Sequence, residues 1–176
     1  MAIIKKFRIK SFKNIQPVLK IDKVSFSFKK RPILDSISFN LNQGEILGLL
    51  GPNGVGKSTI FNLITGLLKP NFGSIIINNK DVLHYPIAER ATTFKIGYVP
   101  QYGGYFHDLT LLQNLKAIAE IQIIDNSIRS NTVEKIISQF EFDSIINIPA
   151  KFLSGGQKKK LVIAFYFLNN TKFLNL

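Results

Sequence analysis

Hydrophobic and polar residues alternate in two stretches near the beginning of the chain. The first stretch begins at about residue 19, a polar turn follows at residues 30–32, and the second stretch ends near residue 41. Alternation with a period of two is typical of strands that bury one face, so the two stretches predict an antiparallel pair. The apolar positions of this pair are Val24, Phe26, Phe28, Ile37, Phe39 and Leu41.

The next apolar segment, residues 46–50, is continuous rather than alternating. A continuous apolar run is typical of a strand that is covered on both faces of a parallel sheet, so we expect a central strand here. Residues 57–68 carry apolar side chains at helical spacing, which predicts a helix that ends near Pro70. Shorter apolar runs predict strands at residues 74–77 and 96–99.

Beyond residue 101 the spacing of apolar residues becomes helical. Two stripes with this spacing predict two amphipathic helices. We therefore expect a helical lobe at about residues 103–150, followed by a further helix from about Lys158. The stripes consist of Leu111, Leu112, Leu115, Ile118 and Ala119, and of Val133, Ile136, Ile137 and Phe140.

The chain has 176 residues, of which 45% are hydrophobic, and it contains no cysteine. This composition is typical of one globular domain, and it excludes a disulfide framework and a thiolate metal site. No apolar run approaches the ~20 residues of a membrane-spanning helix, and the first residues lack the apolar segment of a secretory signal. We expect a cytoplasmic protein.

The net charge of +12 is concentrated at the amino end. Residues 1–31 contain ten of the 23 basic residues and one of the 11 acidic residues, which leaves the remainder only mildly basic. This distribution argues against nucleic acid as a partner of the folded body. Residues 1–18 are expected to form a basic extension, either a solvated tail or an amphipathic contact with an anionic membrane surface or a partner.

A motif with a defined chemistry lies between the predicted central strand and the first predicted helix. It satisfies the pattern G-x-x-x-x-G-K-[ST] and consists of Gly51, Pro52, Asn53, Gly54, Val55, Gly56, Lys57, Ser58 and Thr59. Glycines let successive backbone N–H groups point at a phosphate, and the start of the helix adds its partial positive charge. Lys57 would contact the β and γ phosphates, Ser58 would coordinate Mg²⁺, and Thr59 would reach a phosphate oxygen. The motif predicts a site for a nucleoside triphosphate.

A second cluster with glycines precedes the last predicted helix. Residues 153–157 read Leu-Ser-Gly-Gly-Gln, and Ser154, Gly155 and Gly156 would present a hydroxyl and backbone donors at a helix start. Together with the phosphate loop, this cluster resembles the signature of the ATP-binding cassette (ABC) family. The resemblance implies an α/β fold: a P-loop NTPase core with an antiparallel β subdomain and an inserted helical lobe.

The resemblance covers residues 19–176 and also implies cofactors and a partner. ATP and Mg²⁺ would be bound in a head-to-tail homodimer, with each nucleotide between the phosphate loop of one subunit and the signature of the other. Three consecutive lysines at residues 158–160 follow the signature, either as a solvated face or as charges near the phosphates. The signature residues expected to bind the nucleotide are Ser154, Gly155, Gly156 and Gln157.

Two further residues match positions of the family. Gln101 occupies the position of the Q-loop glutamine, so the resemblance implies that it contacts Mg²⁺ and the attacking water, and it is the candidate catalytic residue. Phe28 occupies the position of an aromatic residue that stacks on adenine. Because aromatic residues are common in strands, Phe28 could instead be an ordinary core side chain.

Family members continue after the signature helix with a strand that ends in an Asp-Glu pair. Residues 171–176 resemble the beginning of that strand, which we expect to lie beside the strand at residues 46–50, with an apolar face left uncovered. Phe165, Tyr166 and Asn175 depart from the family pattern, which suggests that this part of the sequence has drifted or is misread. Without the carboxylates, the chain is expected to bind ATP and to hydrolyse it negligibly.

Within the family, the chain resembles most the ATPase subunits of bacterial lipopolysaccharide export systems. The resemblance implies a place at the inner face of the plasma membrane, where two membrane-embedded permease subunits would carry the specificity for the transported substrate. The features that indicate this branch are the phosphate loop, residues 85–87 with Arg90, residues 96–101, and Phe106 with residues 109–110. The alternatives are a branched-chain amino acid importer ATPase, a soluble ABC ATPase acting on ribosomes or DNA, and a non-catalytic fragment or regulator.

Overall fold

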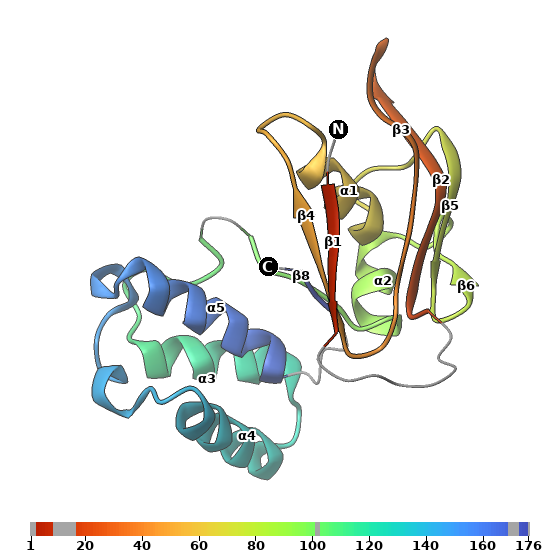
Figure 1. Ribbon diagram of the computed structural model, residues 1–176. Coiled ribbons are helices and arrows are strands. Elements are labelled where there is room, and N and C mark those ends of the chain that lie inside the picture. Colours follow the sequence, from red (N-terminus) through yellow and green to blue (C-terminus); the bar gives the residue numbers. More distant parts are fainter. Residues whose placement is uncertain (1–2, 9–16, 101–102, 169–172, 176) are drawn as a thin grey trace. The chain divides into compact units, whose positions relative to one another are not determined.

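The computed structural model describes residues 3–8, 17–100, 103–168 and 173–175. The chain divides into two compact units, Met1–Phe94 and Lys95–Leu176 (Figure 1). The alternating stretches and the phosphate-loop motif fall in the first unit, and the helical stripes fall in the second.

A four-stranded antiparallel sheet forms the main part of the first unit, which confirms the predicted antiparallel pair. Register shifts interrupt the pair, and Lys23 at one of them has a positive φ of 49°. Such bulges change which side chains share a face. In order across the sheet, the strands are β3 (Arg31–Leu41), β2 (Leu19–Phe28), β5 (Phe72–Ile77) and β6 (Lys80–Asp81).

The core of the first unit consists of apolar side chains from this sheet and from the helix that follows the phosphate loop, α1 (Lys57–Thr65). In β2 the buried pairs Leu19 with Ile21 and Val24 with Phe26 each have the spacing of one strand face, and a register shift lies between the two pairs. The core side chains include Leu19, Ile21, Val24, Phe26, Leu34, Phe39, Ile60, Leu63, Ile75 and Ile77.

The strand that leads into the phosphate loop, β4 (Glu45–Leu50), is paired with β1 (Ile3–Arg8). The two strands are antiparallel, and Ile3 lies opposite Leu50. The solvated tail expected for residues 1–18 is therefore wrong for residues 3–8, because this segment satisfies backbone groups at the edge of β4. Residues 9–16 lie outside the described part of the chain.

The environment of β4 also differs from the prediction of a strand covered on both faces. Ile46 and Leu50 are 55% and 48% exposed. Within the second unit, β8 (Phe173–Asn175) runs parallel to β7 (Ile96–Tyr98), so the expected place of β8 beside β4 stays a prediction. Among the described residues of the first unit, β1 is the strand paired with β4.

Helix α1 ends at Thr65, before the position predicted from its apolar spacing. Gly66 follows in the left-handed conformation, with φ of 88°, which is a common way to end a helix. Leu67, which was expected to continue the apolar face of the helix, is 54% exposed. The apolar period alone therefore overestimated the length of this helix.

Arg90 lies on a short helix that the sequence pattern did not predict, α2 (Ile87–Thr93), and its side chain is only 3% exposed. Its guanidinium donates hydrogen bonds to the backbone carbonyls of Leu63 at 2.8 Å, Ile64 at 3.0 Å and Tyr85 at 2.8 Å. Two of these carbonyls belong to the last turn of α1, where a helix has no partners of its own. Arg90 therefore caps the helix that begins at the phosphate loop.

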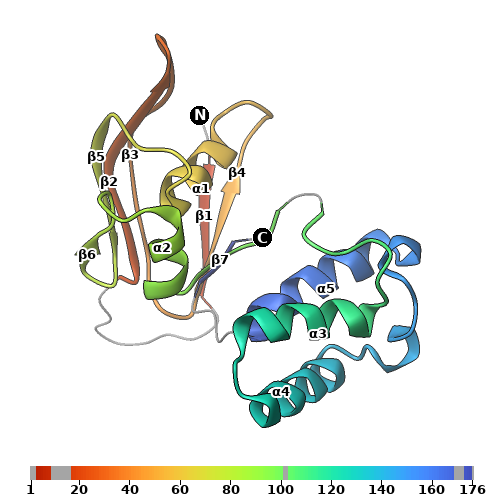
Figure 2. The same ribbon diagram turned by 180° about the vertical axis from the view of Figure 1, so that it is seen from behind.

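Three helices pack together in the second unit (Figure 2). They are α3 (Leu111–Gln122), α4 (Asn126–Gln139) and α5 (Gly155–Leu168), and short 3₁₀ turns lie at Asp143–Ile145 and Ala150–Phe152. The two predicted stripes are confirmed as the faces of α3 and α4 that contribute to a shared core. This core consists of Val99, Leu111, Leu115, Ala119, Val133, Ile136, Phe142, Ala150, Leu153, Leu161, Val162, Ala164, Phe165 and Leu168.

Phe165 and Tyr166 are both integral to this packing, although they depart from the family pattern. Phe165 is only 5% exposed within the core, and Tyr166 packs against the same cluster. The Tyr166 hydroxyl also donates a hydrogen bond to the backbone carbonyl of Tyr98. Their packing does not test the interpretation of these two residues as drifted or misread, which stays a prediction.

One polar side chain is fully enclosed in the second unit. Asn114 on α3 has no exposed surface, and its amide nitrogen donates to the carbonyls of Phe106, Leu109 and Thr110 at 2.9 to 3.1 Å. Its amide oxygen accepts from the Phe106 N–H at 2.7 Å. Asn114 thus fixes the segment that leads from β7 into α3.

Across the part of the chain that the structure describes, the helices are all too short or too polar to cross a membrane.

Candidate functional site

The phosphate-loop motif forms the connection between β4 and α1, as the sequence predicts. Gly54 and Gly56 have φ angles of 81° and 98°, in the left-handed region that favours glycine. A Cβ atom on Gly56 would also lie 2.7 Å from Leu34 Cδ2. The left-handed backbone therefore favours glycine at residue 56, directly before the helix, and a Cβ atom there would force the Leu34 side chain to shift.

Lys57 is the first residue of α1, and its side chain folds back across the loop. Its ammonium donates to the carbonyl of Gly51 at 2.8 Å and to that of Pro52 at 2.9 Å. These contacts hold a positive charge at the surface of the loop, where an anion can approach it.

The start of α1 has no competing anion among the described residues. No side chain caps it, and its first turn contains no acidic residue. The backbone N–H groups of a first helical turn have no partners within the helix, and they carry the positive end of the helix dipole. Ser58 is exposed in this turn, and Thr59 is partly exposed. This donor set fits a polyphosphate, and the Ser58 hydroxyl can serve as one ligand of an accompanying Mg²⁺.

The described residues contain no group of three or more His, Asp or Glu side chains that could hold a metal ion. A magnesium ion with few protein ligands completes its octahedron with phosphate oxygens and water. The arrangement therefore fits Mg²⁺ that arrives with a nucleotide rather than an ion held by the protein alone.

Phe28 is the last residue of β2, next to the hairpin turn, and it is 61% exposed. The alternative that Phe28 is an ordinary core side chain is therefore wrong. Its exposed ring remains available for stacking on a base, which stays a prediction.

The signature residues form the start of α5, which begins at Gly155 and not at about Lys158. The Gln157 N–H donates to Ser154 Oγ at 3.2 Å, and the Ser154 N–H donates to Gln157 Oε1 at 2.8 Å. This reciprocal pair is a capping box. It explains why serine and glutamine occur three residues apart, and it leaves the Ser154 hydroxyl hydrogen available to a ligand.

Gly155 and Gly156 lie between the two capping residues. A Cβ atom on either would meet no atom within 4 Å, and neither residue has the left-handed φ that favours glycine. Neither the packing nor the backbone of this chain therefore explains the two glycines. Their surface permits close approach of a group from outside the subunit.

Two of the three lysines that follow the signature have local contacts. Lys158 donates to the carbonyl of Lys151 at 3.0 Å, and the Lys160 ammonium lies 5.6 Å from the ring centroid of Phe142. Lys159 is exposed. The three lysines therefore do not form a uniformly solvated face.

Gln101 lies outside the described residues, so its predicted contact with Mg²⁺ stays a prediction. The structure assembles the remaining site residues in two groups. Phe28 and residues 51–59 belong to the first unit, and residues 154–157 belong to the second.

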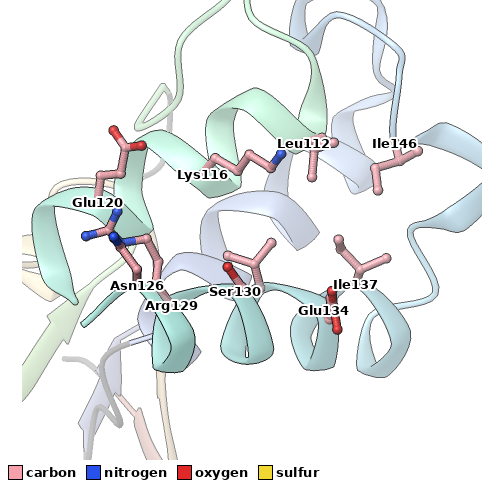
Figure 3. A pocket seen from close by; sticks show the side chains of 10 residues that line it. Leu112, Lys116, Glu120, Asn126, Arg129, Ser130, Glu134, Ile137 and Ile146 are labelled. Atoms are coloured by element: carbon pink, nitrogen blue, oxygen red, sulfur yellow. The ribbon is translucent and has the colours of Figure 1, made fainter. Parts of the chain in front are cut away.

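A pocket of about 430 Å³ between α3 and α4 was not predicted (Figure 3). One end is polar, with Glu120, Asn126 and Arg129, and at the other end Leu112 and Ile137 lie beside the charged side chains of Lys116 and Glu134. Arg129 donates to the carbonyls of Ile123 and Ile124 at the end of α3. The pocket depends on how two helices pack, and the sequence contains no local motif for it.

Comparisons with a family model and with known proteins agree on one family. A family model described as ABC transporter matches residues 34–176. The lipopolysaccharide export ATP-binding protein LptB of Haemophilus influenzae is 34% identical over 160 residues, which cover 90% of this chain and 66% of that protein. The Escherichia coli protein of the same name is 33% identical over 151 residues, covering 85% and 62%. An uncharacterized ABC transporter ATP-binding protein of Rhizobium meliloti is 35% identical over 150 residues, covering 85% and 55%.

Solved structures agree with the fold. The cbiO1 protein from Clostridium perfringens, part of an ABC transporter complex, superposes with a TM-score of 0.78 at 26% identity, covering 90% of this chain and 64% of that chain. The ATP-binding cassette MJ1267 superposes with a TM-score of 0.77 at 28% identity, covering 90% and 68%. The chain thus spans somewhat less than two thirds of the length of the curated relatives that it matches.

Proposed function

This chain belongs to the ABC transporter family, and on that premise we propose that it is the ATP-binding part of a subunit that energises transport across a membrane. The observation that carries the proposal is the start of α1. Backbone donors without a side-chain cap, the Lys57 ammonium and the exposed Ser58 hydroxyl converge there on the place where a triphosphate would bind.

The groups of the phosphate loop and of the first turn of α1 would bind the nucleotide through its phosphates. The N–H groups of the loop and of the first helical turn donate to phosphate oxygens, and Lys57 exchanges its contacts with Gly51 and Pro52 for contacts with the β and γ phosphates. Ser58 would provide a hydroxyl ligand to Mg²⁺, and the ion would neutralise phosphate charge. Phe28 stacks on the base, and Gln101 contacts the metal and a water molecule.

The partner is a second copy of the subunit in head-to-tail orientation. Two observations support this part of the proposal: Gly155 and Gly156 have no role in the packing of their own subunit, and the Ser154 hydroxyl hydrogen remains available. In the dimer, residues 154–157 of one subunit approach the nucleotide held by the phosphate loop of the other. Nucleotide binding then brings the subunits together.

The substrate class proposed is lipopolysaccharide, because the matched relatives include LptB proteins at 33–34% identity. The subunit would act at the inner face of the plasma membrane, with membrane-embedded permease subunits that carry the specificity. Expression of the whole gene in cells depleted of their own lipopolysaccharide export ATPase tests this assignment, and restored growth is the expected result. Restoration of branched-chain amino acid uptake in importer-deficient cells, without restored export, would contradict it.

Nucleotide binding itself is tested with a fluorescent ATP analogue and the purified polypeptide. Lys57→Ala is expected to weaken binding by about 10- to 100-fold, because it removes a charge-assisted contact with phosphate. Lys69→Ala removes an exposed lysine from the same unit and is expected to leave binding unchanged. Equal affinities for both variants would contradict the proposed site.

We also expect this polypeptide of 176 residues to bind ATP with turnover far below the ~1 per second at the low end for enzymes. The catalytic carboxylates implied by the family resemblance are not among its residues. Measurement of phosphate release from saturating Mg·ATP checks this expectation.

A further inference from the structure

The pocket between α3 and α4 is lined by one face of each helix (Figure 3). Leu112, Lys116 and Glu120 follow one another at intervals of four residues, so they share a face of α3. On the opposite side, α4 contributes Arg129 and Val133, which are also four residues apart. The volume of about 430 Å³ lies within the range of ~300–1,000 Å³ that is usual for small-molecule sites.

The apolar part of the lining belongs to a packed core. Val133 is 5% exposed within the shared core of the second unit, and Leu112, Ile137 and Ile146 pack against that core. Because core side chains are closely packed, these groups keep their positions without a ligand. They give an apolar group of a ligand a surface on which to leave water.

Arg129 provides a fixed positive charge at one end of the pocket. Its Nε donates to the carbonyl of Ile123 at 3.0 Å, and its Nη2 donates to the carbonyl of Ile124 at 3.1 Å. Its Nη1 has no hydrogen-bond partner within the described part of the chain. The guanidinium is therefore oriented before a ligand arrives, and it keeps donors for a carboxylate.

Glu120 and Asn126 lie at the same end of the pocket as Arg129 (Figure 3). Among the residues that the structure describes, the side chains of Glu120 and Asn126 make no hydrogen bond or ion pair. The carboxylate can accept from an ammonium group, and the amide can donate to a carboxylate. This end of the pocket therefore offers partners for a positive and a negative group side by side.

The charges around the pocket limit the ligands that it suits. Lys116 and Arg129 offset Glu120 and Glu134, so the lining has no formal net charge. A polyphosphate would meet two carboxylates, and a polyamine would meet two cations. A wholly apolar ligand would remove charged groups from water without giving them partners. A zwitterion with an apolar remainder satisfies both the charges and the apolar surface.

We propose that the pocket between α3 and α4 binds a free α-amino acid with an apolar side chain. The carboxylate of the ligand accepts from Arg129 and Asn126, its ammonium donates to Glu120, and its side chain packs on Leu112 and Val133. The site goes beyond ATP binding and does not depend on it, because its residues all belong to the second unit.

Binding is tested by equilibrium dialysis of the whole 176-residue chain against radiolabelled leucine without nucleotide. Saturable binding is expected. Isocaproate lacks the ammonium and isoamylamine lacks the carboxylate, so each should compete at least about tenfold more weakly than leucine. Glycine should also compete weakly, because it lacks the apolar side chain. Absence of saturable binding, or equal competition by the three analogues and leucine, would overturn the proposal.

A variant tests the assigned partner of the ammonium. Glu120→Gln keeps the shape of the side chain and removes its charge, so it should weaken leucine binding at least about tenfold. Competition by isocaproate, which has no ammonium, should not weaken. Glu141→Gln is the matched control, because Glu141 is exposed beyond the end of α4 and does not line the pocket. Equal affinities of the two variants for leucine would contradict the role of Glu120.

The position of the site is tested by NMR of the backbone amides. Leucine should shift signals of residues 112–137 and leave those of the first unit in place. Shifts confined to the first unit would overturn the proposal. Affinity for ATP is measured separately: leucine binding without ATP binding would contradict the proposed function alone, and ATP binding without leucine binding would contradict this inference alone.

Discussion

Arg90 shows how a single buried charge can support a binding loop from the far end of a helix. Burial lowers the pKa of its guanidinium, and Asp81 acts in the opposite direction, but an arginine stays protonated in proteins. Its positive charge lies at the carbonyl end of α1, where it complements the helix dipole. The same helix presents its amide end to the proposed phosphate site.

Arg90→Met is expected to lower the free energy of unfolding by about 2–4 kcal/mol, because it keeps the stem and leaves three carbonyls without their donor. Thermal and urea unfolding measure the change. Arg31→Met, at an exposed position of β3, is the control and should change stability by less than about 0.5 kcal/mol. Similar stability of the two variants would show that the buried bonds contribute little.

Tyr166 predicts a dependence of stability on pH in the alkaline range. Burial, followed by the effect of Tyr98, raises its folded pKa above the ordinary value of 10.0, so its contribution is fully present below that value and is lost as the pH rises through the folded pKa. Urea unfolding at about pH 8 and about pH 11 should therefore show a larger loss for the unmodified chain than for Tyr166→Phe. An identical loss in both would contradict the raised pKa.

The phosphate loop and Arg90 show which functional and structural residues can be identified from the sequence. The phosphate loop consists of nine consecutive residues with one chemical task, so the motif identified them without knowledge of the fold. The sequence pattern used Arg90 only as one of the features that indicate a branch of the family. Its structural partners at Leu63 and Ile64 lie 27 and 26 positions away, and the sequence carries no local signal for them.

At the scale of elements, the local spacing of apolar residues predicted those strands and helix faces whose positions depend on local burial. The strands β2, β3, β5 and β7 and the faces of α3 and α4 follow from the spacing of apolar residues. The pairing of β1 with β4 was missed because it joins segments about 40 residues apart and depends on an available strand edge. Helix α2 was missed because it has only seven residues, which is too short for a clear period.

Asn114 connects two elements and gives a test at this scale. Asn114→Leu keeps the approximate volume but leaves the Phe106 N–H and carbonyl without their partner, while the Leu109 and Thr110 carbonyls keep backbone donors. It should destabilise the chain by about 2–4 kcal/mol. Exchange should increase first in residues 105–110. Asn131→Leu, on the exposed surface of α4, is the matched control. Equal melting temperatures for the two variants would contradict the role of Asn114.

At the scale of the whole molecule, the proposed site is distributed over two compact units and two copies of the chain. The phosphate loop and the signature each follow from local chemistry, and the structure confirms the local element in which each lies. Their joint use of one nucleotide would require the proposed association of subunits, which neither local pattern contains. The assembly is implied by the family resemblance alone and stays a prediction.

Association is tested with Gly156→Glu. No atom lies within 4 Å of a Cβ at this residue, so the subunit should fold normally, while the added carboxylate would face the partner's phosphates. Light scattering with saturating Mg·ATP should show a dimer for the unmodified chain and for Lys159→Glu, and a monomer for Gly156→Glu. ATP affinity of the monomer should not change. A Gly156→Glu chain that still dimerises with ATP would contradict the proposed interface.

The reciprocal hydrogen bonds between Ser154 and Gln157 have a consequence for repeated association and separation of the proposed dimer. Since the first turn of α5 is capped by its own side chains, loss of a bound nucleotide would not unfold it. In the proposed dimer, the subunits could separate without refolding this helix before they associate again.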